Sequence, residues 1–352
     1  MARFAFWLSA LAVIQAAHAL RYLGRVNPAT KELTWSATGL SFAFSGESAT
    51  ITFQGLTGSN SAELIVDGAS TYIPDLEGDS ISTPANLTYG YHTVEFRKSS
   101  EALFGSIFIG NVTTDGQFER DPVPTRRKRR KIEFIGDSIT SAYGIAGAFP
   151  CTNTAALEVI SQGYAVRAAK AFRADYSIIS WSGIGIIRNY PSGTADSGPI
   201  MPVRYTRYGA NDPDDSYPFP LTDRPDAVVI NLGTNDFGHS DGRPLLSPAD
   251  YTAALVSFVY TIQHMYGSKP VIFFMTSPLL GDAYPADEMQ KTVQTLALYD
   301  AVAQLLWTTT AYVVHWPTQT SNVGCDYHPT ADTNAIGAAA LQSALAKVLK
   351  WA

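Results

Sequence analysis

The second half of the chain alternates short apolar runs with longer helical patterns, and this alternation limits its fold more than any other feature. The apolar runs predict β-strands at 132–135, 176–180, 227–232, 271–275 and 312–315. Apolar residues at helical spacing predict helices at 162–173, 248–265, 286–307 and 331–349. Strands that alternate with helices form a parallel sheet covered on both faces. Ligands of such sheets bind at the carboxyl ends of the strands.

The first part of the chain has a different pattern, typical of antiparallel β-structure. Short β-rich runs at 40–44, 49–53, 62–66, 92–97 and 103–109 are separated by Gly and Asp-Gly turns. Strands at this spacing indicate a β-sandwich or jelly roll. We therefore expect a β-domain at 20–122, a linker at 123–131 and an α/β/α three-layer domain at 132–352. The linker contains a basic run at 125–131 that holds six of the 25 Lys and Arg residues, which is either a solvated connector or a dibasic processing site.

The first 19 residues have the pattern of a secretory signal peptide. Arg3 precedes an apolar run at 4–14, and Ala17-His18-Ala19 provides a small-x-small cleavage site. The apolar run is shorter than the roughly 20 residues that a transmembrane helix needs. We therefore expect a secreted, extracellular protein whose mature chain begins at residue 20.

Other features agree with secretion. Asn86 and Asn111 begin Asn-x-Thr sequons and are candidate glycosylation sites. Cys151 and Cys325 are the only cysteines, and in an oxidising compartment they would pair; the alternative is two free thiols. The formal net charge of -6 argues against nucleic acid or an anionic membrane as partner. We expect a monomer that binds neither.

A candidate nucleophile follows the first strand of the α/β region. Ser138 lies in Gly136-Asp137-Ser138, where a turn from strand to helix would expose its hydroxyl. A serine hydroxyl needs a base within hydrogen-bond reach. His328 is the best candidate because Asp326, two residues earlier, could orient its imidazole as the third member of a triad. His239 is the alternative, since it has aspartates on both sides, at positions 236 and 241.

Two further segments contain candidate donors for an oxyanion. Asn235 follows the strand at 227–232 in Gly233-Thr234-Asn235-Asp236, and its side-chain amide could donate a hydrogen bond. Gly183 and Gly185 follow the strand at 176–180, where a glycine allows a backbone N–H to approach the substrate. With the backbone N–H of Ser138, these groups would form an oxyanion hole. Either glycine fits, and Gly185 is preferred.

The four segments resemble, in order and spacing, the blocks of the SGNH branch of the GDSL hydrolases. One position departs from that pattern, which places an aspartate three residues before the histidine. Here Cys325 occupies that position, and Asp326 lies two residues before His328. This spacing, the aromatic Tyr327 between them and the preceding β-domain resemble carbohydrate esterase family 2. That resemblance implies a jelly roll followed by an SGNH domain. It also implies removal of acetyl groups from xylan, glucomannan and related plant polysaccharides.

The resemblance leaves the orienting group of His328 open, because some members of that family use a backbone carbonyl instead of an aspartate. Candidate substrate-binding residues are Trp181, Arg188, Tyr190 and Tyr327. The long polar stretch at 189–224 is either a wall of the substrate site or a passive surface insertion. No cofactor and no metal are expected. The alternative functions are a broad carboxylesterase or lipase, and a non-catalytic carbohydrate-binding protein.

Overall fold

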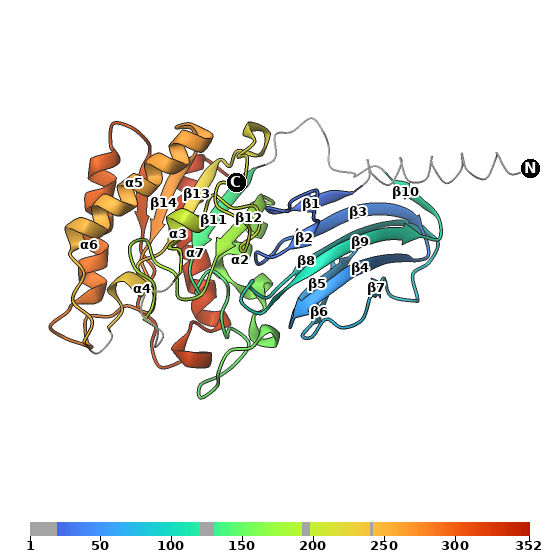
Figure 1. Ribbon diagram of the computed structural model, residues 1–352, viewed down its shortest axis with the longest axis horizontal. Helices are drawn as coiled ribbons and strands as arrows, with labels where there is room; N and C mark the ends of the chain where they lie inside the picture. Colours follow the sequence, from blue (N-terminus) through green and yellow to red (C-terminus); the bar gives the residue numbers. More distant parts are fainter. Residues whose placement is uncertain (1–19, 120–129, 192–197, 240–241) are drawn as a thin grey trace, which may run out of the picture.

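The computed structural model describes residues 20–119, 130–191, 198–239 and 242–352, which form two domains side by side (Figure 1). The expected signal peptide and most of the basic run lie outside the described residues. Of that run, Arg130 and Lys131 are described. Arg130 donates to the carbonyl of Ala352, and Lys131 begins the first strand of the α/β domain.

The N-terminal domain is a β-sandwich, as predicted. One antiparallel sheet contains β1 (Arg21–Leu23), β3 (Gly39–Gly46), β5 (Ala62–Val66), β6 (Ala69–Ile73), β8 (Gly90–Lys98) and β10 (Gln117–Glu119). The other contains β2 (Glu32–Leu33), β4 (Ala49–Gly58), β7 (Ser80–Ser82) and β9 (Gly105–Thr114). Phe44 and Phe96 of the first sheet pack with Ile107 of the second in one buried core. The strand predicted from Leu103 begins at Gly105 instead, and Leu103 lies in the preceding turn.

The C-terminal domain is the predicted parallel sheet with helices on both faces. Its strands are β11 (Lys131–Gly136), β12 (Asp175–Ser180), β13 (Ala227–Asn231), β14 (Val271–Met275) and β15 (Ala311–Val314), in the order β12-β11-β13-β14-β15. Alternate residues of each strand point to opposite faces. Ile135 and Ile230 therefore belong to one core with α5 (Pro248–Tyr266) and α6 (Gln290–Leu305). Phe134 belongs to the other core, with α2 (Tyr164–Ala171) and α7 (Ala331–Leu349).

Shorter helical segments lie in the connections between these elements. They are α3 (Met201–Arg204), α4 (Thr234–Phe237), and the 3₁₀ turns η1 (Ala155–Leu157), η2 (Ile160–Gln162), η3 (Leu221–Asp223) and η4 (Cys325–Tyr327). In the strand order, β11 lies between β12 and β13. The chain therefore adds β12 on one side of β11 and then crosses over to add β13 on the other side. Such a reversal opens a crevice at the carboxyl ends of the strands. The residues that follow β11 and β13 therefore meet at this edge of the sheet.

A buried ion pair joins the two domains. Arg25, which follows β1, places Nη2 at 3.2 Å from Oε1 of Glu133 on β11, and both side chains are 1% exposed. The guanidinium also lies over the rings of Tyr205 and Tyr217, at 4.5 and 4.2 Å from their centroids. A buried charge that loses its partner is strongly destabilising, because water cannot replace the lost interaction. This pair therefore constrains how the sandwich docks on the sheet.

The substitution Glu133→Ala should lower the free energy of unfolding by about 3–5 kcal/mol, because it leaves the Arg25 guanidinium buried and unpaired. The control is Arg21→Ala, which removes the domain-spanning pair of Arg21 with Asp175, whose side chains are 36% and 34% exposed. That change should cost under about 1 kcal/mol, since solvent screens the pair. Denaturant unfolding of the full chain measures both. Equal losses in the two variants would contradict the importance of the buried pair.

Candidate active site

Ser138 lies where the chain leaves β11, in the crevice at the carboxyl edge of the sheet. The carboxylate of Asp137 accepts a hydrogen bond from the amide of Ile139 at 3.0 Å, and the Asp137 carbonyl accepts from the amides of Thr140 and Ser141. These bonds close a tight turn around Ser138. The direct turn from strand into helix that the sequence suggested is not found, because the chain continues from Ser138 through turns. The helix predicted at 162–173 follows later, as α2 from Tyr164.

The structure brings Ser138 and His328 together, although 190 residues separate them. Nε2 of His328 lies 2.8 Å from Oγ of Ser138. Nδ1 lies 3.0 Å from the backbone carbonyl of Asp326. A carbonyl can only accept a hydrogen bond, so Nδ1 carries the proton and Nε2 is left as the acceptor. The hydroxyl of Ser138 therefore donates to His328, which is the arrangement of a nucleophile with its base.

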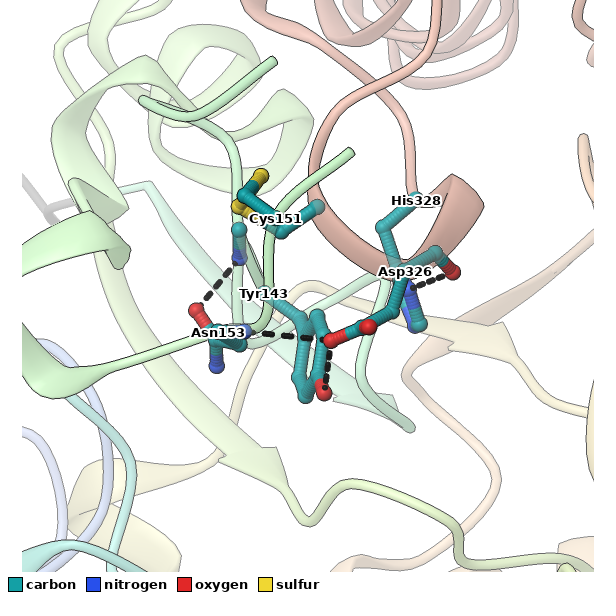
Figure 2. Close-up of a disulfide and its surroundings, with 7 residues drawn as sticks. Tyr143, Cys151, Asn153, Asp326 and His328 are labelled. Atoms are coloured by element: carbon teal, nitrogen blue, oxygen red, sulfur yellow. Dashed lines mark hydrogen bonds between the residues drawn. A yellow bond between two sulfur atoms is a disulfide. The ribbon is translucent and has the colours of Figure 1, made fainter. Parts of the chain in front are cut away.

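Of the two orienting groups that the sequence left open, the backbone carbonyl of Asp326 bonds to this imidazole, and the carboxylate that a triad would use has other partners. Its Oδ2 accepts hydrogen bonds from the hydroxyl of Tyr143 at 2.8 Å and from the amide of Asn153 at 3.1 Å (Figure 2). Asp326 adopts the left-handed region, with φ 48°, within the η4 turn, and this turns its carbonyl rather than its carboxylate toward Nδ1. The backbone carbonyl thus holds the third position of the constellation.

Tyr143 supports the imidazole from its ring face. The ring centroids of Tyr143 and His328 are 4.0 Å apart, with 30° between the planes. Tyr143 therefore contacts both His328 and the carboxylate of Asp326. No sequence pattern singled out Tyr143 or Asn153, because their partners lie more than 170 residues away.

The disulfide between Cys151 and Cys325 confirms the predicted pairing and lies beside this turn (Figure 2). The amide of Asp326 donates to the carbonyl of Cys151 at 3.0 Å, and the amide of His328 donates to the carbonyl of Cys325 at 2.9 Å. A covalent link thus ties the segment before His328 to the loop that follows Ser138. The two catalytic candidates are connected through this link as well as through their own hydrogen bond.

The structure favours Gly183 over Gly185 as the glycine at the site, which reverses the preference from sequence. Gly183, with φ +79°, lines the same cavity as Ser138 and Asn235. The amide of Gly185 already donates to Oδ1 of Asn189 at 3.1 Å. A Cβ at Gly185 would come within 2.1 Å of the carbonyl of Arg188, so glycine is needed there for packing.

Asn235 reaches the cavity from α4, which follows β13. Its Nδ2 donates to the carbonyl of Ile184 at 2.7 Å and lies 3.5 Å from Oδ2 of Asp137. The first bond is short and fixes the side chain, whereas the second is at the limit of hydrogen-bond distance, so the second amide hydrogen is available to a ligand. The neighbouring Asp236 accepts from the amides of residues 186–188, and so holds the loop after β12 against α4.

A cavity of about 940 Å³ opens above Ser138. Three of the predicted substrate-binding residues line it: Trp181, Tyr190 and Tyr327. The stretch at 189–224 contributes Pro199 and Arg204 to its wall, and Leu103 reaches it from the β-sandwich. Tyr284, which the sequence did not indicate, is 78% exposed at the same cavity.

Two predicted residues take other positions. Arg188 is not among the residues that line the cavity, and its guanidinium donates to the carbonyls of Asp236 and Pro244. His239 lies at the cavity wall, but its Nδ1 bonds to Oε1 of Glu288 at 2.7 Å, while His328 makes the contact with Ser138. Residue 241, the second aspartate near His239, lies outside the described residues.

Burial sets the protonation of the site. Desolvation lowers the pKa of His328 to about 4, although its bond to the Asp326 carbonyl and the nearby carboxylate act in the opposite direction. The imidazole is therefore neutral at pH 7 and able to accept a proton. Desolvation also raises the pKa of Asp137 to about 7, against the hydrogen bond from Ile139. Across the described ranges, no group of three or more His, Cys, Asp or Glu side chains could hold a metal ion.

The fold and the serine–histidine pair together define a hydrolase of the GDSL class. The model of the GDSL-like Lipase/Acylhydrolase family matches residues 132–341, and the Carbohydrate esterase 2 N-terminal model matches residues 22–124. The chain belongs to carbohydrate esterase family 2 and is a carboxylic ester hydrolase.

Known relatives span both domains. An acetylxylan esterase / glucomannan deacetylase of Cellvibrio japonicus is 30% identical, over 87% of this chain and 82% of that protein. The crystal structure of a family 2 carbohydrate esterase with a carbohydrate binding domain, from Corynascus thermopiles (Myceliophthora fergusii), shares 54% identity. It superimposes with a TM-score of 0.90 over 95% of this chain and 100% of that one. A family two esterase from Clostridium thermocellum, in complex with cellohexaose, is 26% identical with a TM-score of 0.81, over 95% and 100% of the two chains.

The imidazole of His328 should titrate near pH 4 in an NMR experiment that follows the histidine ring protons. His92 provides an internal control, because its hydrogen bond to Asp67 raises the pKa of His92 above 6.5. The His92 resonance should therefore move at higher pH than the His328 resonance, and the spectrum of His328→Ala identifies the latter. Titration of His328 at or above the ordinary histidine value would contradict the buried, neutral imidazole.

Proposed function

We propose that this protein is a secreted serine esterase that removes O-acetyl groups from plant cell-wall polysaccharides of the xylan and glucomannan type. One observation carries the proposal: Oγ of Ser138 lies 2.8 Å from Nε2 of His328, at a cavity of about 940 Å³. The hydroxyl is thus placed to lose its proton to a neutral base while it attacks a bound ester.

In the first step, Oγ of Ser138 forms a bond to the acetyl carbonyl carbon while Nε2 of His328 takes its proton. The carbonyl oxygen becomes an oxyanion, which the backbone amides of Ser138 and Gly183 and the side-chain amide of Asn235 stabilise. The carbon–oxygen bond to the sugar then breaks. His328 returns its proton to the leaving sugar oxygen, and the acetyl group stays on Ser138.

In the second step, water attacks the acetyl-enzyme and gives a proton to Nε2 of His328. Acetate leaves when the bond to Oγ breaks and His328 protonates the serine. The imidazolium formed in each step needs support at Nδ1. In this structure the Asp326 carbonyl accepts that hydrogen bond, and the Asp326 carboxylate adds a nearby negative charge.

The rim of the cavity supports a carbohydrate substrate. The ring of Tyr327, 60% exposed, packs at a tilt of 32° against Phe149 with centroids 4.3 Å apart, and Tyr190 and Tyr284 are also exposed. Flat aromatic faces of this kind suit the apolar faces of sugar rings. The acetylxylan and glucomannan activities in the name of the Cellvibrio relative and the cellohexaose bound to the Clostridium relative point to the same substrate class.

Secretion is part of the proposal and is supported by several features. Residues 1–19 have the pattern of a signal peptide, and a disulfide links Cys151 to Cys325. Asn86 and Asn111, the two sequon asparagines, are both exposed. Within the described ranges, no helix combines the length and apolar character needed to cross a bilayer. We propose a monomeric mature chain that starts at residue 20, with esterase residues 132–352.

The substitution Ser138→Ala should reduce acetyl release to the uncatalysed background, because it removes the nucleophile. Asn235→Ala should lower kcat by about 10²–10³-fold, the usual cost of one oxyanion donor. Acetate release from acetylated xylan and glucomannan measures both, and a series of chromogenic esters of increasing acyl length separates an acetylesterase from a lipase. Wild-type rates in Ser138→Ala, or a preference for long acyl chains, would contradict the proposal.

The substitution Asp326→Asn should lower kcat by less than about 10-fold, since the carbonyl that orients His328 is unchanged. Loss of the aspartate in a full Ser-His-Asp triad costs about 10⁴-fold. Asparagine tolerates the left-handed backbone found here, so the turn should be retained. His328→Ala, which removes the base, is the reference for complete loss in the same assay. A fall in kcat of about 10⁴-fold in Asp326→Asn would show that the carboxylate, and not the carbonyl, orients His328.

A further inference from the structure

The connection between β8 and β9 of the sandwich enters the α/β domain beside the cavity. Residues 98–101 are fully buried at this interface, and Leu103, two residues on, lines the cavity. The hydroxyl of Ser99 donates to the carbonyl of Glu158 at 2.6 Å and accepts from the amide of Ile160 at 2.9 Å. The β8–β9 connection is therefore anchored to the domain that carries Ser138.

Glu101 of this connection binds the loop that carries Gly183. Its Oε2 accepts from the amide of Ser182 at 2.8 Å, and its Oε1 accepts from the hydroxyl of the same residue. On the other side of Gly183, its carbonyl accepts from the amide of Tyr190 at 2.7 Å. The peptide that joins Ser182 to Gly183 is thus held from both ends, and its N–H belongs to the oxyanion hole proposed above.

The Glu101 carboxylate has a fixed place because its own backbone is held. The amide of Glu101 donates to Oε2 of Glu158 at 2.6 Å, and Nζ of Lys98 donates to the carbonyl of Glu101 at 3.0 Å. Oε1 of Glu158 in turn accepts from the side chain of Asn153 at 2.8 Å. The amide of Asn153 donates to the carboxylate of Asp326, next to His328. One buried network therefore touches both sides of Ser138.

We infer that Glu101, a residue of the β-sandwich, is a positioning residue for catalysis. It acts through Ser182 to hold the amide of Gly183 where the oxyanion develops, so the esterase site is incomplete without the β-domain. This inference rests on the proposed function. Placement errors of about 1 Å at such a donor are enough to cost about 10²-fold in rate.

A second carboxylate–serine pair at the same interface offers a matched control. Glu63 of β5 accepts a hydrogen bond from the hydroxyl of Ser161 in η2. Glu63 is buried like Glu101, and the pair also joins the sandwich to the α/β domain, yet neither residue lines the cavity. Substituting either residue of this pair therefore measures how much a contact between the domains contributes to stability, separately from catalysis.

The test compares steady-state hydrolysis of a chromogenic acetate by full-length variants with their melting temperatures. Glu101→Ala should lower kcat by about 10²-fold, within the cost of one oxyanion donor, while KM changes by less than about threefold. Glu101→Gln should recover most of this loss, because its carbonyl oxygen accepts from the Ser182 amide and its amide donates to the hydroxyl. Glu63→Ala and Ser161→Ala should lower the melting temperature but keep kcat.

A double-mutant cycle identifies the path of the effect. Ser182→Ala removes one of the two bonds to Glu101, so combining it with Glu101→Ala should add nothing to the loss in kcat. Folded Glu101→Ala with wild-type kcat would overturn the inference, and so would additive effects in the cycle. If Glu101→Ala does not fold, unchanged kcat in Ser182→Ala, which loses one of the two bonds to Glu101, would overturn it. Ser138→Ala, assayed in parallel, tests the proposed function separately, since activity there would refute the nucleophile and not Glu101.

Discussion

Between the β-sandwich and the parallel sheet lie ionisable side chains that water does not reach, and each has a hydrogen-bond partner from across the interface. Glu133 meets Arg25 of the sandwich, Glu101 of the sandwich meets Ser182, and Glu158 meets the amide of Glu101. A buried charge without its partner costs several kcal/mol, whereas apolar contacts tolerate small shifts. These polar bonds therefore allow one docking of the two domains, and the active site is built at its edge.

Around Ser138, backbone groups as well as side chains hold the catalytic residues in place. The base is oriented by the carbonyl of Asp326, and the turn around the nucleophile is closed by the Asp137 carbonyl and carboxylate. A carbonyl in a rigid turn has a fixed direction, and the disulfide beside His328 adds a covalent restraint on that turn. The Asp326 carboxylate is then available to Tyr143 and Asn153, which extend the restraint to the loop after Ser138.

The cavity above the serine is assembled from segments that are far apart in the chain. Leu103 comes from the sandwich, Trp181 and Tyr190 from the connection after β12, Tyr284 from the connection after β14, and Tyr327 from the η4 turn. Sequence-distant side chains can converge in this way because parallel strands end at one edge, and because the sandwich packs beside β12 (Figure 1). At this contact Arg97 of β8 lies over the ring of Tyr176 of β12.

Sequence alone determined the elements whose signals are local. The apolar strands and amphipathic helices followed from periodicity, and Ser138, Asn235 and His328 followed from their short motifs. Tertiary structure decided what depends on direction and long-range contact. From the sequence, either the carbonyl or the carboxylate of Asp326 could orient His328. In the structure the left-handed turn at Asp326 directs the carbonyl to His328. Both Gly183 and Gly185 fit the motif and sequence favoured Gly185, but in the structure the amide of Gly185 already donates to Asn189 and the Asp236 carboxylate packs against this glycine. Glu101 carried no sequence signal, because its partner Ser182 lies 81 residues away in the other domain.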